Sequence, residues 1–141
     1  MNIGSIIRNR AEVVSVQPGA PVPMVIETLV EHRIGAVLVL EGDQIAGVLS
    51  ERDIVRCLAE QGEAALSKCA SDLMTADVVT VAPDESVYEA MSNMTRRRFR
   101  HLPVVDRGRL VGIVSMGDLV KARIDEAERE AESLKDYIQH A

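Results

Sequence analysis

The sequence predicts an α/β (α+β) fold built from two similar copies of one small unit, and three observations lead to this prediction. The chain has 141 residues, the size of one ordinary domain or of two small halves. It is 47% hydrophobic but only 2% aromatic and has no Trp, so we expect a core of Val, Ile, Leu, Ala and Met. This mixture favours β-branched strands covered by helices. The third observation is an internal repeat.

The repeat has a spacing of 65 residues and continues without a gap over most of each copy. Residues 47–53 and 112–118 carry Gly, Ser and Asp at matching positions. Far upstream, residues 13–18 align with residues 78–83 in the same register. A unit of about 50 to 60 residues forms only a marginal core alone, so we expect the two copies to pack on each other.

The first copy predicts the order strand, helix, strand, strand, helix, preceded by a short helix at residues 2–9 that packs across the repeat. Pro18 ends the first strand, and Pro21 can open the helix because proline is tolerated in a first turn. Ser50 caps the last helix, which ends near Gly62. The expected strands are 13–16, 35–40 and 45–49, with a turn at 41–44, and the expected apolar helix faces are Val22, Ile26, Leu29 and Val30, and Ile54, Val55, Cys57 and Leu58.

The second copy follows a helical linker at residues 67–74 and repeats this order. Its expected elements are a strand at 78–81, a helix opened by residues 84–86, strands at 102–105 and 110–114 with a turn at 106–109, and a final helix from Ser115 to about Ile138. The end of that helix is acidic and carries a thin apolar stripe. The stripe is compatible with a solvated helix or with helix packing between subunits, and its residues are Ile124, Ala127, Ala131, Leu134 and Ile138.

Ser115 and Asp118 form a candidate nucleotide site where a strand ends and a helix begins. A hydroxyl beside free helix N–H groups suits a phosphate, and a carboxylate one turn further can accept hydrogen bonds from a ribose diol. Arg98, Arg100 and His101 add donors for a phosphate. The alternative is that the Ser and Asp of each copy only cap the helix. Repetition of the pair and the basic cluster beside it favour ligand contact.

Composition excludes several classes of function. The net charge is −6, which argues against a general nucleic-acid binder, although 11 of the 16 Lys and Arg follow residue 65 and leave room for a local anion site. His32, His101 and His140 lack metal-ligand spacing, and Cys57 and Cys69 are expected to be free thiols. The sequence shows no P-loop, no apolar run of about 18 residues and no signal-peptide core. We therefore expect a cytoplasmic protein that is neither an enzyme nor bound to a membrane.

A β-α-β-β-α unit in tandem, each copy closing on Gly-h-h-Ser-x-x-Asp, resembles the CBS domain, named after cystathionine β-synthase. The resemblance covers residues 8–61 and 73–124 and leaves residues 125–141 as a helical tail. It implies that the copies pack with pseudo-two-fold symmetry into one module with two clefts. In this family the clefts commonly bind adenosine compounds such as AMP, ADP, ATP, NAD or S-adenosylmethionine, and modules often dimerise. Small free-standing bacterial pairs look like ligand sensors.

The resemblance also implies roles for individual residues. In the second copy, Asp118 would hold the ribose and Ser115 the ribose or phosphate. The base would lie against Thr80 and Pro103, and the phosphate against Arg100 and His101. In the first copy Ser50 and Asp53 match, and Ser15 aligns with Thr80, but Gly35 and Ala36 replace the two phosphate donors. The first cleft would therefore bind more weakly, or would borrow Arg52 or Arg98.

The sequence thus predicts a homodimeric sensor that binds an adenine nucleotide of the AMP, ATP or NAD class and reports its state to a protein partner. The main alternative is a ligand-free module for protein interaction or dimerisation. A third possibility, an RNA or DNA binder using residues 96–100, is disfavoured by the net charge and by the scarcity of aromatic side chains.

Overall fold

The computed structural model describes residues 1–7 and 13–140 and divides into two compact units. One unit is Ala11–Thr80, and the other joins Met1–Arg10 to Val81–Ala141. Residues 8–12, with which the predicted first repeat begins, and residue 141, the last of the predicted tail, lie outside the described part. Among the described residues, no helix combines the length and the apolar character needed to cross a membrane.

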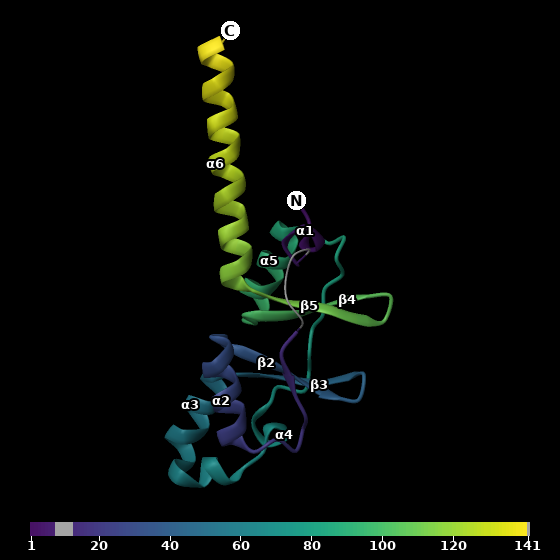
Figure 1. Cartoon of the computed structure of the whole chain (residues 1–141), viewed down its shortest axis with the longest axis vertical. Helices are drawn as coiled ribbons and strands as arrows, with labels where there is room; N and C mark the ends of the chain where they lie inside the picture. Colours follow the sequence, from purple (N-terminus) through teal and green to yellow (C-terminus); the bar gives the residue numbers. More distant parts are fainter. Residues whose placement is uncertain (8–12, 141) are drawn as a thin grey trace. The chain divides into compact units, whose positions relative to one another are not determined.

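The Ala11–Thr80 unit contains a three-stranded sheet in the order β1-β2-β3 (Figure 1). Strand β1 is parallel to β2, and β2 is antiparallel to β3. The strands are β1 (Ser15–Val16), β2 (Ala36–Glu41) and β3 (Gln44–Ser50), and the helices are α2 (Val22–His32), α3 (Glu51–Gln61), a 3-10 helix η1 (Gly62–Ser67) and α4 (Ala70–Leu73). Of the predicted linker helix at 67–74, only residues 70–73 form a helix, α4, and residue 67 ends the preceding helix η1.

The core of this unit follows from the apolar pattern of its helices and strands. Helix α2 buries Val22, Val25 and Leu29, and β2 is buried at four consecutive residues because side chains on both its faces are covered. Helix α3 buries Ile54 and Cys57. The short helix α4 is capped by Asp72, whose carboxylate accepts a hydrogen bond from the Cys69 backbone N–H at 3.0 Å. That bond lowers the pKa of Asp72 from its ordinary value of 3.8.

The second unit has the same plan around the hairpin of β4 (His101–Asp106) and β5 (Arg109–Ser115). The two-residue turn between them places Arg107 and Gly108 at φ 53° and 79°, as a tight hairpin requires. The helices are α1 (Ile3–Ile7), α5 (Val87–Arg97) and α6 (Met116–His140). The core consists of small and medium apolar side chains, as the composition predicted: Ile3, Val87, Ala90, Met94, Leu102, Val104, Val114 and Leu119.

The predicted strand at 78–81 is wrong, because only Val81 pairs, in an isolated parallel bridge to Val104. The first copy forms a backbone hydrogen bond that the second copy lacks. There the Leu38 N–H donates to the Val14 carbonyl at 3.4 Å, and the residue 65 positions after Leu38 is Pro103. Proline has no N–H, so the corresponding bond to Val79 cannot form and the parallel ladder shrinks to one bridge.

The short helix that precedes each copy packs on the other copy. Helix α1 precedes the first copy, yet its Ile3 N–H donates to Glu85 at 3.0 Å and its Gly4 N–H to Pro83 at 2.8 Å. Helix α4 precedes the second copy, yet its Ala70 donates to Ala20 at 2.8 Å and Ser71 to Pro18 at 2.9 Å. These acceptors are equivalent pairs under the 65-residue repeat. The prediction that the N-terminal helix packs across the repeat is therefore confirmed.

The repeated glycine of each motif allows this packing. A Cβ on Gly47 would lie 2.7 Å from the Met74 sulfur and 2.8 Å from the Thr75 carbonyl oxygen, which is too close. A Cβ on Gly112 would lie 3.3 Å from a methyl of Ile7 in α1. The segment that precedes the other copy thus covers the third strand of each motif at its glycine.

Candidate functional site

Ser115 and Asp118 lie at the corner where β5 ends and α6 begins, as the motif predicted. The Asp118 N–H donates to Ser115 Oγ at 3.1 Å, and the Ser115 N–H donates to Asp118 Oδ2 at 2.8 Å. These reciprocal bonds cap the first turn of α6. The carboxylate is therefore held in one orientation at the end of the strand, half-buried.

The first copy repeats this corner between β3 and α3. The Asp53 N–H donates to Ser50 Oγ at 3.2 Å, and the Ser50 N–H donates to Asp53 Oδ2 at 2.9 Å. The Ser50 hydroxyl also donates to Asp53 Oδ2, at 3.0 Å. The Ser50 N–H and the Ser50 hydroxyl thus both donate to Oδ2 of Asp53, and a carboxylate offers about four lone-pair sites in total. The capping alternative is thus present in both copies, but it leaves Asp53 with acceptor capacity for a diol.

Three basic residues lie beside this corner in the second copy, and we call them the basic arm: Arg98, Arg100 and His101. His101 is the cross-strand partner of Ser115, and the Arg100 carbonyl accepts a hydrogen bond from the Met116 N–H at 2.8 Å. Arg98 follows α5 in the left-handed conformation, at φ 61°. The fold therefore brings Arg100 and His101 next to Ser115 and Asp118, with Arg98 two residues away along the chain.

These bonds correct one sequence-based expectation. Met116 and Asp118 already use their N–H groups, so two donors at the N-terminus of α6 are not free for an anion. The side chains of Arg98, Arg100 and His101 are the other predicted donors to a phosphate at this corner, and their roles stay predictions.

The first copy has the same backbone but lacks the basic arm. Ala36 is the cross-strand partner of Ser50, and the Gly35 carbonyl accepts a hydrogen bond from Glu51 at 2.9 Å. The first copy therefore forms the same backbone contacts at its corner, but Gly35 and Ala36 carry no positive charge. Arg52 lies exposed in the first turn of α3.

The remaining predicted residues are more scattered. Ser15 lies exposed on the edge strand β1, and Pro103 is buried in β4 opposite Ile113. Thr80 is exposed at the end of the Ala11–Thr80 unit, whereas Ser115 and Asp118 belong to the other unit. The roles of Thr80, Ser15 and Pro103 in holding a base stay predictions.

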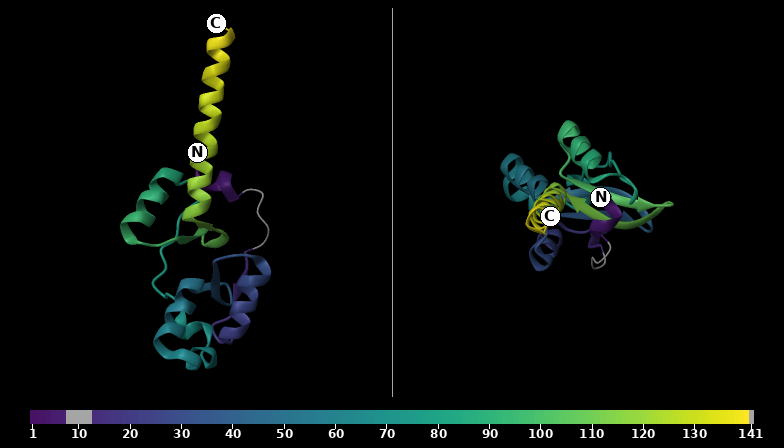
Figure 2. Two further views of the ribbon diagram at one scale, coloured as in Figure 1. Left: turned by 90° about the vertical axis from the view of Figure 1, so that its left-hand side faces the viewer. Right: turned by 90° about the horizontal axis from the view of Figure 1, so that it is seen from above.

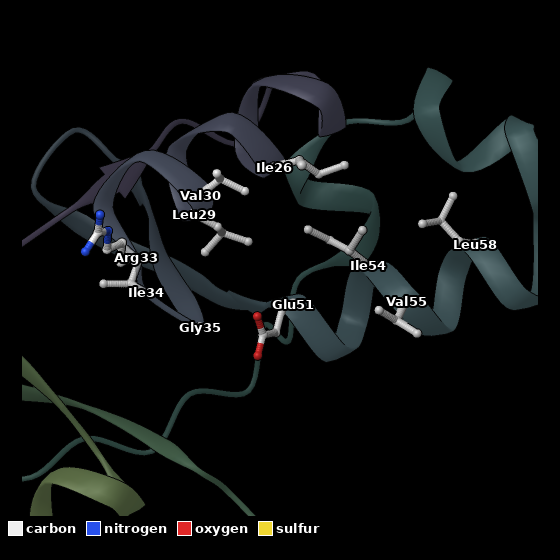
Figure 3. A pocket seen from close by; sticks show the side chains of 10 residues that line it. All are labelled: Ile26, Leu29, Val30, Arg33, Ile34, Gly35, Glu51, Ile54, Val55 and Leu58. Carbon is white, nitrogen blue, oxygen red and sulfur yellow. The ribbon is translucent and has the colours of Figure 1, made fainter.

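An apolar groove in the Ala11–Thr80 unit was missed by the sequence analysis. Figure 3 shows it between α2 and α3, with a volume of about 570 Å³. The predicted apolar face of each helix includes residues that do not pack against the core, so Val30 and Val55 remain 72% and 65% exposed. The groove suits an apolar side chain better than a phosphate, and its lining residues are Ile26, Leu29, Val30, Arg33, Ile34, Gly35, Glu51, Ile54, Val55 and Leu58.

A second, more polar cavity lies between α1 and α6 and has a volume of about 500 Å³. Asp118 is part of its wall, together with Lys121 and Arg129 from α6 and Ser5 from α1. The exchanged helix α1 therefore reaches the neighbourhood of the Asp118 corner. Among the described residues, no group of three or more His, Cys, Asp or Glu is placed to hold a metal ion.

The two capped corners, repeated on the same helix-strand-strand-helix plan, agree with a family comparison. The sequence profile of the CBS domain matches this chain twice, at residues 3–60 and 70–125. The chain belongs to the CBS-domain family. The mixed α/β class and the two CBS repeats predicted from the sequence are thereby confirmed.

Relatives of known structure support the same conclusion. A CBS-domain containing protein from Agrobacterium tumefaciens is 39% identical, with a TM-score of 0.84, and the match covers 87% of this chain and 99% of that one. A CBS domain protein from Pyrobaculum aerophilum, solved as a complex with AMP, is 27% identical with a TM-score of 0.74, covering 84% and 89%.

A mitochondrial CBS domain-containing protein of Arabidopsis thaliana is 37% identical over 119 residues, which is 81% of this CBS pair. The pair spans only 58% of the length of that relative. The match therefore establishes the family and the repeated motif, and it leaves the activity and partners of the complete relative out of the comparison.

Proposed function

We propose that this CBS pair binds an adenine nucleotide at the corner formed by Ser115 and Asp118 and reports the bound state to a protein partner. The observation that carries the proposal is the placement of a fixed carboxylate, a hydroxyl and the basic residues Arg100 and His101 at one strand end. The complex of the Pyrobaculum aerophilum relative with AMP supports an adenosine ligand.

In this proposal each side chain contacts one part of the nucleotide. Asp118 accepts hydrogen bonds from the ribose hydroxyls, Ser115 contacts the ribose or phosphate, and Arg98, Arg100 and His101 bind the phosphate. Thr80 and Pro103 flank the base. The corner of Ser50 and Asp53, with Ser15 and Arg52 near it, forms a weaker second site because Gly35 and Ala36 supply no cation.

Binding can act as a signal only if the ligand favours one arrangement of the pair over another. A nucleotide shifts such an equilibrium by no more than its difference in affinity for the two states. A ligand that favours one state would make the population of that state depend on nucleotide concentration, and a homodimer would present that change to a partner.

A panel of AMP, ADP, ATP, NAD, S-adenosylmethionine and adenosine tests the proposal by thermal unfolding and calorimetry. We expect at least one phosphate-containing member to stabilise the pair progressively, by about 2.7 kcal/mol at 100 times its Kd. Asp118→Glu is the informative variant, since Glu also forms a capping box but carries its carboxylate one methylene further. It should lose at least tenfold in affinity while the ligand-free protein unfolds as before.

The exposed groove between α2 and α3 favours a second candidate, a ligand-free interaction module. Its exposed Val30 and Val55 offer an apolar surface that a protein partner can cover. The absence of any shift across the panel, with unchanged behaviour of Asp118→Glu, would reject the sensor and leave this alternative.

A further inference from the structure

Helix α6 carries an apolar seam that its own unit does not cover. Its 25 residues extend beyond the hairpin and the other helices of the unit (Figures 1 and 2). Ile124, Leu134 and Ile138 are 53%, 60% and 67% exposed. They belong to a set spaced alternately four and three residues apart, which is the a and d pattern of a coiled coil: Val120, Ile124, Ala127, Ala131, Leu134 and Ile138.

The neighbouring helix α1 lies against a different face of α6. The cavity between the two helices is lined on the α6 side by Ala122, Asp125 and Arg129, among others. In the heptad these three are f and b positions, on the side opposite the seam, and of the other α6 residues in the lining only Lys121, at an e position, borders the seam. Within the described residues, α6 from residue 127 to residue 140 is exposed at every position.

We infer that the seam pairs with the same seam of a second copy of this chain, so that two α6 helices form a parallel two-stranded coiled coil. Ile at the a positions 124 and 138 and Leu at the d position 134 are the combination that favours two parallel strands. Ala127 and Ala131 between them let the helix backbones approach closely.

The charges beside the seam select the parallel orientation. In a parallel pair each g residue faces the e residue five positions later in the other chain. Arg123 then faces Glu128 of the second copy, and Glu130 faces Lys135. Both pairs are attractive. Arg123 already bonds Glu126 in its own helix at 3.1 Å, and a guanidinium has donors for both carboxylates.

The antiparallel alternative brings like charges together. When the six seam residues overlap fully in opposite directions, Lys121 faces Lys135, Glu128 faces Glu128 and Glu130 faces Glu130 of the second copy. All three contacts are repulsive. The charges beside the seam therefore favour the parallel pair and disfavour the antiparallel pair. The inference does not depend on nucleotide binding.

The dissociation constant of the dimer, measured by sedimentation equilibrium on the full chain, tests the seam. Leu134→Glu combined with Ile138→Glu should raise this constant at least tenfold. Ser133→Glu combined with Gln139→Glu adds the same charge at c and b positions of the same turns and should change it less than twofold. The replaced side chains are exposed, so circular dichroism should show both variants folded.

Charge reversal tests the orientation. In a parallel pair, Lys135→Glu and Glu130→Lys each create a repulsive contact and should weaken the dimer, whereas the double variant should restore it. In an antiparallel pair, Lys135→Glu would instead attract Lys121 and tighten the dimer. A monomeric parent protein, a seam variant with unchanged association, or a tighter Lys135→Glu dimer would each overturn the inference.

Discussion

Ser115 and Asp118 show how one pair of side chains can stabilise a helix and remain suited to a ligand. Their reciprocal bonds, 3.1 and 2.8 Å long, cap α6 and hold the carboxylate in place. A carboxylate that is already fixed loses little conformational entropy when it binds a diol. The cap is therefore compatible with the proposed ribose binding.

Arg100 provides the clearest prediction for a single residue, since in the proposed site it contacts the phosphate and not the nucleoside. Arg100→Ala should reduce AMP affinity about 10- to 150-fold, the loss of about 1.5–3 kcal/mol expected for a hydrogen bond to a charged group. Adenosine has no phosphate, so its affinity should change less than threefold. Titration calorimetry with both ligands measures the difference.

The matched control for Arg100 is Arg52→Ala, an exposed arginine in the first turn of α3 beside the other corner. It should leave binding at the stronger site unaltered. Equal losses of AMP and adenosine in Arg100→Ala would remove this residue from phosphate recognition.

At the scale of single elements, α2 and α5 end in the same unusual way. Arg33 and Arg98 follow the two helices in the left-handed conformation, at φ 53° and 61°, and occupy equivalent positions of the repeat. This conformation costs roughly 1–2 kcal/mol for a residue with a Cβ. Arg98 belongs to the proposed phosphate site, where such strain is commonly retained.

Replacing these arginines by glycine should separate stability from binding. Arg33→Gly and Arg98→Gly should each raise the free energy of unfolding by about 0.5–1 kcal/mol, because relief of strain exceeds the greater entropy of the unfolded glycine chain. Only Arg98→Gly should also weaken AMP binding. Urea denaturation with and without AMP measures both effects.

Arg56→Gly provides the control, since Arg56 is exposed inside α3 and not at a helix end. There glycine should lower the free energy of unfolding by about 1 kcal/mol. A loss of stability in Arg33→Gly of the same size would contradict the assignment of strain.

At the scale of the whole molecule, one unit depends on a segment from the other end of the sequence, because α1 belongs to the unit that otherwise begins at Val81. Ile3 of α1 is fully buried in the unit that otherwise begins at Val81. Residues 1–7 are therefore part of a core that lies almost entirely in the second half of the chain.

Ile3→Ala should consequently lower the free energy of unfolding by about 2–5 kcal/mol, although it is only the third residue of the sequence. Ile3→Val removes one methylene and should cost about 0.5–1.5 kcal/mol. Guanidinium denaturation of the full chain provides the measurement. If both variants were as stable as the parent protein, α1 would not pack as the structure shows.

Much of this protein could be predicted from local patterns in the sequence. The 65-residue repeat, the order of most strands and helices, the turns at both hairpins and the capped Ser and Asp of each copy all depend on residues near one another along the chain. Side-chain periodicity and helix capping act over a few residues, so they are visible without a structure.

Other features required contacts between distant residues, and the tertiary structure decided them. The strand expected at 78–81 was lost because Pro103, more than twenty residues away, supplies no N–H. Val30 and Val55 belong to the apolar faces of α2 and α3, yet they lie outside the core and remain exposed. Which copy α1 joins depends on whether Glu85 and Pro83 or their equivalents accept its hydrogen bonds, and this choice is made only when the chain folds.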